Sequence, residues 1–270
     1  MSREYLVAVD LEGIHGVVGE PYKTLTGSSD YPLACKNAVK EINAVVKALF
    51  DCGADKVTVW DNHGSWNNID FSEVDARVEV LNDESWKKKG RMVFAAEHSF
   101  CGMIYLGYHA KEGSLGGVLA HTYSSVGLQY YKINGESVGE IEIDQYAAAE
   151  FGIPSILVSS DDVCISQAKA AIPGVRTVIT KYGKGRNAAE LIDGEEVVRA
   201  LYEETVKAVN NNTVAPRKLE MPAKFEVRYT RMEDAERHLR SFLAAGKKAS
   251  YGEDAHIIEM EITDINDIFI

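Results

Sequence analysis

The chain has 270 residues, enough to bury a sizeable hydrophobic core without disulfide bonds or structural metal ions. Hydrophobic residues make up 46% of it and charged residues 26%, with 22 Gly and 6 Pro, which is typical of a folded globular protein and excludes collagen-like and low-complexity chains. Acidic residues outnumber basic ones by 41 to 29, for a net charge of −12. Because such a chain repels polyanions, we expect neither nucleic acid nor an anionic membrane as a partner.

The cysteines and the first residues indicate a reduced, cytoplasmic protein. The four cysteines are scattered without a Cys-x-x-Cys pair, so we expect reduced core residues and no zinc knuckle. They are Cys35, Cys52, Cys101 and Cys164. The apolar run at 5–9 stops at Asp10 and is too short for a signal-peptide core or a membrane span.

The predicted elements alternate between strand and helix. Residues 5–9 form a short apolar run, typical of a strand buried on both faces. Residues 33–50 carry apolar side chains at helical spacing before Gly53, which predicts an amphipathic helix. The next predicted strands are 56–60, 103–108, 155–158 and 176–180, and the next predicted helices are 143–151, 163–171 and 195–209. This alternation predicts an α/β fold, a three-layer αβα domain with a mostly parallel or mixed sheet.

The remaining segments predict a hairpin and a small second lobe. A strand at 128–133 runs into Asn134-Gly135, a two-residue turn in which both positions tolerate positive φ, so we expect a projecting hairpin near 128–139. The stretch 210–222 has three consecutive Asn, two Pro and no periodicity, which indicates a boundary. We therefore predict a main domain over 1–212 and a small α+β lobe over 213–270, built from strand, helix and strand at 225–229, 232–243 and 257–262.

Acids and histidines follow the predicted strands, at the sheet edge where ligands bind in α/β folds. Asp10 and Glu12 follow the first strand, and alternate residues of an extended chain point the same way, so both carboxylates can reach one site. The alternative is a solvated turn. His63 follows the second strand, where the alternative is an Asx turn. His109 follows the third strand, where a satisfied core histidine is the alternative.

Further candidates lie next to these or in loops. Asp61 and Asn62 precede His63 and can orient its ring or hold a neighbouring loop. His121 follows a glycine-rich stretch, and a loop imidazole suits general acid or base chemistry, although an exposed loop histidine explains it equally well. Glu140 lies where the chain enters a helix, a position that acids also occupy for the helix dipole alone.

Five of these residues together form a donor set for a dinuclear metal centre: Asp10, Glu12, His63, His109 and Glu140. Three carboxylates and two neutral imidazoles carry a charge of about −3, which two zinc ions and one bridging hydroxide bring close to neutral. Oxygen and nitrogen donors without thiolate fit Zn²⁺, and Mn²⁺ or Co²⁺ bind the same groups.

Two other motifs have plainer explanations. The segment 183–188 (GKGRNA) is similar to a dinucleotide-binding fingerprint, but it is not followed by a strand that ends in an acidic residue. A turn, or contact of Lys181 and Arg186 with a substrate carboxylate, is favoured. The segment 159–162 (SSDD) is typical of a helix N-cap with acids at the positive end of the dipole.

Five motifs, taken together in chain order, resemble those of the DppA-type D-aminopeptidase family of cocatalytic zinc peptidases. The resemblance covers nearly the whole chain. The motifs are Val9-Asp10-Leu11-Glu12-Gly13, Asp61-Asn62-His63 with Asn67-Asn68, Gly107-Tyr108-His109-Ala110, Ala120-His121 and Val138-Gly139-Glu140. The resemblance implies two zinc ions per subunit, bridged by Asp10 and completed by Glu12, His63, His109 and Glu140. It also implies a ring-shaped homo-oligomer, a decamer, that encloses its active sites.

His121 matches the remaining active-site histidine of the family, which is described there as a nucleophile. On physical grounds we expect a metal-activated water to attack, and His121 to donate a proton or stabilise the oxyanion. The leading hypothesis is thus a metal-dependent aminopeptidase that removes an N-terminal residue, D-Ala or another D-residue, from short peptides or amino-acid amides.

Two alternatives stay open. A dinuclear metal phosphoesterase uses similar ligands, but few basic residues lie near these motifs to hold a phosphate. A non-catalytic module that binds metal or peptide is the other alternative, and His121 argues against it.

Overall fold

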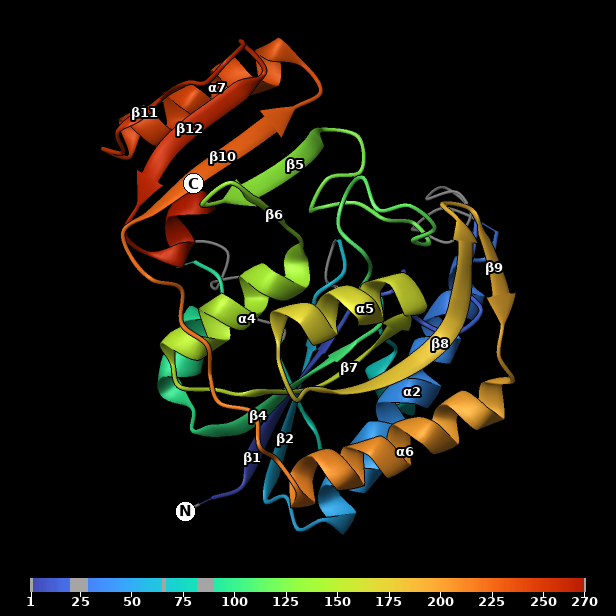
Figure 1. Ribbon diagram of the computed structural model, residues 1–270. Coiled ribbons are helices and arrows are strands. Elements are labelled where there is room, and N and C mark those ends of the chain that lie inside the picture. The colour runs from blue at the N-terminus through green and yellow to red at the C-terminus, as the bar shows by residue number, and fades with distance from the viewer. Residues whose placement is uncertain (1, 20–28, 65–66, 82–89, 270) are drawn as a thin grey trace.

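The structure is a computed structural model that describes residues 2–19, 29–64, 67–81 and 90–269. Its centre is sheet A, in which the described strands follow the order β3-β2-β1-β4-β7-β8-β9 (Figure 1). Neighbouring strands from β3 to β8 are parallel, and β9 is antiparallel to β8. Their bounds are β1 (Glu4–Val9), β2 (Lys56–Asp61), β3 (Glu79–Val80), β4 (Phe100–Leu106), β7 (Ser155–Asp161), β8 (Arg176–Gly185) and β9 (Ala188–Leu191).

Helices cover both faces of sheet A and form the outer two layers. The alternating side chains of β1 show the division: Tyr5, Val7 and Val9 pack into one core, and Leu6 and Ala8 pack into another. The first core includes residues of α2 (Tyr31–Asp51) and α6 (Gly194–Asn210), and the second includes residues of α4 (Glu140–Glu150) and α5 (Asp162–Ala171). The predicted three-layer architecture with a mostly parallel sheet is confirmed.

A second, antiparallel sheet B lies beside α4 and has the order β11-β12-β10-β5-β6 (Figure 1). It joins β5 (Leu128–Ile133) and β6 (Glu136–Val138) to β10 (Ala223–Tyr229), β11 (Ala249–Tyr251) and β12 (Ile257–Ile262), and α7 (Met232–Ala244) packs against it. The predicted Asn134-Gly135 turn is present, with φ values of +51° and +85°. However, the hairpin does not project alone, because β5 pairs along its length with β10. The predicted boundary between 212 and 213 separates strands that share sheet B, and that division into domains stays a prediction.

Several predicted bounds need correction. β4 ends at Leu106, two residues before the predicted end, because Gly107 turns the chain with a φ of +69°. Helix α4 begins at Glu140, earlier than predicted, so that the acid occupies its first turn. The segment 183–188 is the β8–β9 hairpin, which supports the turn and not the dinucleotide fingerprint. Short 3₁₀ helices lie at Phe71–Glu73, Val93–Glu97 and Ile265–Ile268.

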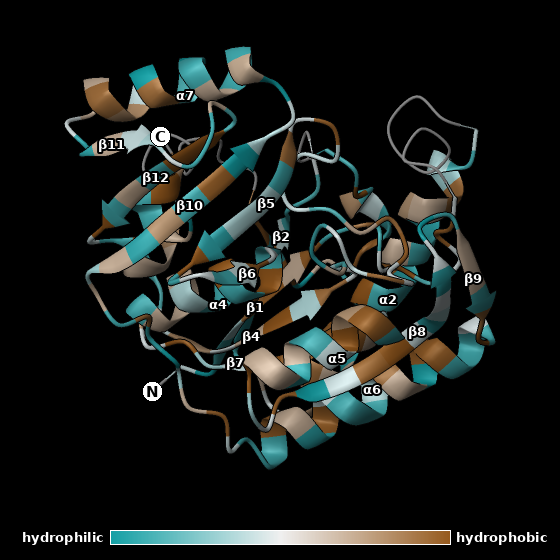
Figure 2. Cartoon of the chain, turned by 45° about the horizontal axis from the view of Figure 1, so that its top comes forward, coloured by the Kyte–Doolittle hydropathy of each residue, from teal (hydrophilic) through white to brown (hydrophobic). Residues whose placement is uncertain are grey.

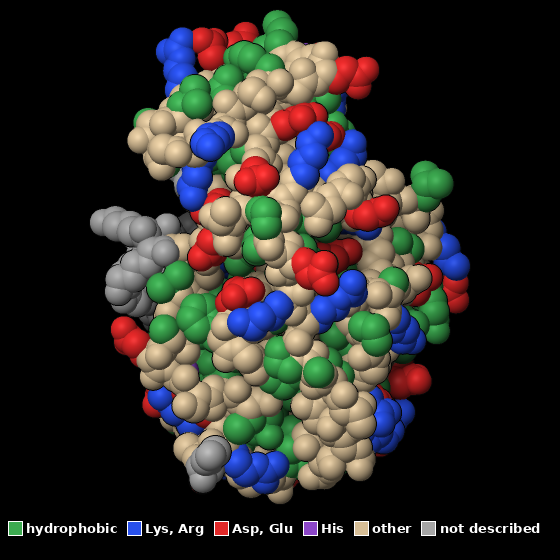
Figure 3. All heavy atoms as spheres, turned by 60° about the vertical axis from the view of Figure 1, so that its left-hand side comes forward, with side chains coloured by type: hydrophobic (Ala, Val, Ile, Leu, Met, Phe, Trp, Pro, Cys, Tyr) green, Lys and Arg blue, Asp and Glu red, His purple; other side chains and the backbone are tan. Residues whose placement is uncertain are grey.

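The hydropathy of the elements matches their place in the layers. Helix α6 is banded in hydrophilic and hydrophobic residues (Figure 2), and its buried positions face the core. Acidic and basic side chains alternate over the face shown in Figure 3. All four cysteines are free, but Cys164 alone among them is buried and Cys101 is exposed, which corrects the prediction of four core residues. Among the described residues, no helix is both long and apolar enough to cross a membrane.

Candidate active site

The site forms where three neighbouring strands of sheet A end. Asp10 follows β1, His63 follows β2 and His109 follows β4, and β1 lies between the other two strands. Parallel strands deliver the residues after their carboxyl ends to the same edge of a sheet. The sheet order therefore places Asp10 between the two histidines.

The two carboxylate oxygens of Asp10 face different histidines. Asp10 Oδ1 lies 2.8 Å from His63 Nδ1, and Asp10 Oδ2 lies 3.5 Å from His109 Nε2. Glu12 Oε2 lies 3.1 Å from the same nitrogen of His63, and Glu140 Oε1 lies 3.1 Å from the same nitrogen of His109. These five side chains are buried, and the structure brings all of them together.

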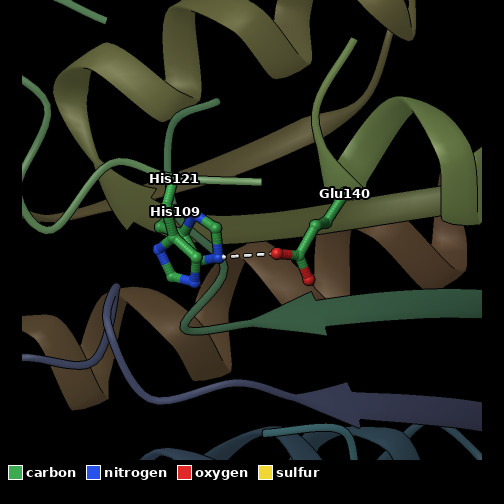
Figure 4. Close-up of side chains that lie close together, drawn as sticks. All are labelled: His109, His121 and Glu140. Carbon is green, nitrogen blue, oxygen red and sulfur yellow. Dashed lines mark ion pairs between the residues drawn. The ribbon is translucent and has the colours of Figure 1, made fainter. Parts of the chain in front are cut away.

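The donors fall into two groups whose ligand atoms lie within 4.8 Å of one another. One group is Asp10, Glu12 and His63, and the other is His109, His121 and Glu140. Figure 4 shows the second group, with His121 lying against His109 and Glu140 approaching from α4. The rings of His121 and His109 are stacked, with centroids 3.9 Å apart and an interplanar angle of 10°. Nδ1 of His121 lies 2.8 Å from the Leu119 carbonyl oxygen, which fixes the ring in this position.

Main-chain packing sets the distance between the loops that carry Asp10 and His109. The Gly13 N–H donates to the Gly107 carbonyl oxygen at 2.7 Å. A Cβ atom on Gly13 would lie 2.0 Å from the Tyr108 carbonyl oxygen, and one on Gly107 would lie 2.2 Å from the Asp10 carbonyl oxygen. Both positions require glycine because no side chain fits between the two backbones.

Asp61 holds the loop after β2, as one of the two sequence interpretations proposed, and does not contact the His63 ring. Its Oδ2 accepts hydrogen bonds from the N–H groups of Asn68 (2.6 Å) and Ile69 (3.2 Å). The Asn68 side chain donates to Asp61 Oδ1 at 2.9 Å and to the His63 carbonyl oxygen at 2.6 Å. These bonds fix the backbone that presents His63.

The buried carboxylates give the site an excess of negative charge, which shifts the pKa values of its members. Burial raises the pKa of Asp10 to about 7, and the neighbouring Glu12 carboxylate adds to the rise. Burial alone would lower the pKa of His109, but attraction to Glu140 outweighs it and raises that pKa to about 10. The same attraction lowers the pKa of Glu140 to about 2 against the effect of burial. By contrast, burial and the neighbouring His109 lower the pKa of His121.

The donor set fits divalent metal ions on its chemistry and its geometry. Glu12 Oε2 is buried, and beyond its 3.1 Å ion-pair contact with His63 Nδ1 it has no hydrogen-bond partner among the described residues. A buried carboxylate of this kind is favourable mainly where a cation compensates its charge. All the donors are carboxylate oxygens or imidazole nitrogens, which Zn²⁺ and Mn²⁺ accept. If two such ions bind, their positive charge would replace the charge of the protons that the two imidazoles otherwise carry.

Lys181 corrects one prediction from the sequence. It is fully buried, and its Nζ donates to three main-chain carbonyl oxygens, those of Glu12 (2.6 Å), Ile14 (2.8 Å) and Val17 (2.7 Å). It therefore holds the loop after β1 and cannot bind a substrate carboxylate. Arg186 donates to the Ala120 carbonyl oxygen beside His121, so it too contacts main chain.

Sequence reasoning missed a buried pair, Arg91 and Asp144, which lies beside the site residues. Asp144 contacts the side chains of Asn62 and Tyr108, the residues just before two of the site histidines. Its spacing of one helical turn from Glu140 was a usable signal, because residues four apart share a helix face. Arg91 lies outside regular structure and gave no such signal.

Comparison with known proteins identifies the family. The model of the peptidase M55 family, described as D-aminopeptidase, matches residues 4–249. The chain belongs to this family. It is accordingly a peptidase enzyme of the aminopeptidase class, as the sequence predicted.

A related sequence and a solved structure show the same relationship. A D-aminopeptidase of Bacillus subtilis (strain 168) is 28% identical over 205 residues, which cover 76% of this chain and 73% of that protein. The solved structure of the zinc-dependent D-aminopeptidase DppA from Bacillus subtilis, described as a self-compartmentalizing protease, superposes with a TM-score of 0.86 at 22% identity. That match covers 98% of this chain and 94% of the other, so the two proteins share their fold over almost their full length.

Proposed function

We propose that this aminopeptidase holds two divalent metal ions, with Asp10 as the shared ligand. The observation that carries this assignment is the orientation of Asp10, whose two oxygens face His63 and His109. Glu12 and His63 complete one set of donors, and His109 and Glu140 complete the other. Zinc is the proposed metal, because the donors fit it and the DppA structure is of a zinc-dependent enzyme. Mn²⁺ and Co²⁺ are the proposed substitutes.

The proposed reaction is hydrolysis of the bond after the N-terminal residue of a short peptide or an amino-acid amide. Two metal ions at this site would supply Lewis acidity and a nucleophilic hydroxide near neutral pH. His121 is half-buried and stacks on His109 within the group that includes Glu140, so it is positioned to protonate the leaving amine or to donate a hydrogen bond to the oxyanion. A carboxylate near the metals would recognise the free α-amine of the substrate.

Substrate chirality, assembly and location complete the proposal. The related sequence and the solved structure both carry the name D-aminopeptidase, so we propose an N-terminal D-residue, D-Ala among them. DppA is described as self-compartmentalizing, and we propose that this chain likewise forms a ring-shaped homo-oligomer, a decamer, around its sites. The four free cysteines support a cytoplasmic location.

Metal removal tests this function directly. We expect exhaustive chelation, with removal verified by elemental analysis, to abolish hydrolysis of a D-Ala amide, and Zn²⁺, Mn²⁺ or Co²⁺ to restore it. The fully reconstituted enzyme should contain two ions per chain. Full activity in verified metal-free protein would contradict the proposal, as would a single ion per chain at full activity.

A parallel panel on the reconstituted enzyme separates the remaining alternatives. Matched L- and D-aminoacyl amides and dipeptides should show preference for the D-series, and a generic phosphodiester should not be cleaved. Cleavage of the phosphodiester alone would favour a phosphoesterase, and binding of metal without turnover of any substrate would favour a non-catalytic module.

A further inference from the structure

A buried carboxylate connects the segments that carry the site histidines and Glu140. Asp144 lies on α4, one helical turn after Glu140, and has 0% exposed surface. Its Oδ2 accepts hydrogen bonds from the Tyr108 hydroxyl at 2.7 Å and from Asn62 Nδ2 at 3.4 Å. Asn62 Nδ2 also donates to the Tyr108 hydroxyl oxygen at 2.8 Å. The three side chains therefore form a closed hydrogen-bonded triangle.

Each corner of this triangle is close in sequence to a proposed metal ligand. Asn62 precedes His63 after β2, Tyr108 precedes His109 after β4, and Asp144 shares the first two turns of α4 with Glu140. None of the three corner residues is among the proposed ligands. The triangle consequently joins three chain segments that β2, β4 and α4 deliver separately.

Arg91 fixes the carboxylate of Asp144. Its Nε donates to Asp144 Oδ1 at 2.5 Å and its Nη2 donates to Asp144 Oδ2 at 2.6 Å. The guanidinium also lies 4.8 Å from the ring centroid of Trp60 and 5.6 Å from that of Tyr123. A bidentate pair defines the plane of the carboxylate and offsets the cost of burying its charge. Asp144 thus has a single orientation in which it meets Asn62 and Tyr108.

We propose that Asp144 is a positioning residue that sets the relative placement of His63, His109 and Glu140, and so determines how tightly the centre binds metal. The inference rests on the proposed function, because it assigns a role toward the same metal centre. Asp144 acts through its neighbours and does not touch the ligand atoms. Groups that contact metal ligands directly typically contribute about 10- to 100-fold in metal affinity or activity. Because Asp144 acts one residue further out, we expect an effect at the lower end of that range.

The sharpest test removes one hydroxyl. Tyr108→Phe deletes the hydrogen bonds of this hydroxyl to Asp144 and from Asn62 and keeps the ring, and Tyr105→Phe is its control. Tyr105 is equally buried, and its ring lies 5.1 Å from that of Tyr108, but its hydroxyl pairs with Ser155 Oγ at 2.7 Å and not with Asp144. Tyr108→Phe loses two buried hydrogen bonds, to Asp144 and from Asn62, whereas Tyr105→Phe loses one. Thermal unfolding of the metal-free protein therefore measures the structural loss of each variant separately from its zinc affinity.

The readouts are the zinc dissociation constant, measured by competition with a chromophoric chelator, and thermal unfolding of the metal-free protein. We expect Tyr108→Phe to weaken zinc binding about 10-fold or more and Tyr105→Phe to stay within about threefold of the unsubstituted enzyme. The loss of thermal stability should be larger in Tyr108→Phe, because it removes one more hydrogen bond. Equal zinc affinities of the two variants would overturn the inference. Absence of zinc binding by the unsubstituted enzyme would instead overturn the proposed function.

Asp144→Asn provides a second, independent variant. It keeps the shape of the side chain but removes the charge that pairs with Arg91, so the amide loses its fixed orientation. We expect a larger loss of zinc affinity than in Tyr108→Phe, and a change in the visible absorption of the Co²⁺-loaded protein. If Asp144→Asn does not fold, the tyrosine pair still decides the question. A folded Asp144→Asn with unchanged zinc affinity and Co²⁺ spectrum would refute the positioning role.

Discussion

At the scale of single residues, His121 differs from the other site histidines. It is half-buried, whereas His63 and His109 are buried, and it stacks on His109 without an ion pair to a carboxylate among the described contacts. A residue placed in this way can reach a substrate that enters from solvent. Its geometry therefore suits an oxyanion contact or proton transfer better than a structural role.

Two substitutions at this position distinguish these roles. We expect His121→Ala to lower kcat by about 10²- to 10³-fold, the usual effect of removing one oxyanion donor, with both metal ions still bound. His121→Gln keeps a hydrogen-bond donor, so it should recover part of that loss if His121 stabilises the oxyanion and none if it transfers a proton. Steady-state kinetics with metal analysis measure both. A loss of one metal equivalent in His121→Ala would instead identify His121 as a ligand.

At the scale of secondary structure elements, β8 contributes to the site without supplying a ligand. Lys181 on β8 crosses to the loop after β1 and donates to three of its carbonyl groups. Thr180 Oγ1 donates to the Gly13 carbonyl oxygen of the same loop at 2.6 Å. The loop that follows Asp10 and Glu12 is thus fixed by a strand three places away in the sheet order.

The hydrogen bonds from Lys181 and Thr180 to the loop after β1 lead to a stability prediction. Lys181→Met leaves three buried carbonyl groups without their donor, each a loss of about 1–3 kcal/mol before relaxation, so we expect a loss of at least about 3 kcal/mol in unfolding free energy. The control Thr180→Val removes one hydrogen bond and should lose about 1 kcal/mol. Urea unfolding of the metal-free proteins measures both. Equal losses of unfolding free energy in the two variants would show that Lys181 does not hold the loop through its three hydrogen bonds.

The parts of the site that the sequence predicts are those that follow local patterns. Asp10, His63 and His109 follow apolar runs that are recognisable as strands, so their meeting at one sheet edge could be anticipated. The pairing of β5 with β10 joins segments about 90 residues apart, and no local pattern records it. Contacts of Arg91 and Lys181 were unpredictable for the same reason, because their partners lie far away in the chain.

At the scale of the whole molecule, the net charge of the chain opposes the proposed assembly. The chain carries a net charge of −12, so identical copies repel one another at low ionic strength. A ring-shaped assembly must overcome this repulsion through contacts between subunits. Enclosure of the sites would also restrict access to small substrates.

Light scattering tests the assembly. We expect a mass several times that of one chain, which does not fall when salt is raised, because added ions screen the repulsion between copies. The same enzyme should cleave a short D-aminoacyl peptide but leave the same residue uncleaved at the terminus of a folded protein. A monomer with full activity would argue against enclosure.

The close contact of Gly13 with Gly107 has a consequence for how this enzyme can diverge. Two glycine backbones act as a spacer of fixed thickness between the Asp10 and His109 loops, and neither can gain a side chain. Substitutions elsewhere around the site can alter which substrates bind, whereas a side chain at Gly13 or Gly107 would force the Asp10 and His109 loops apart. Substrate preference can thereby change without any change in the distance between the two loops.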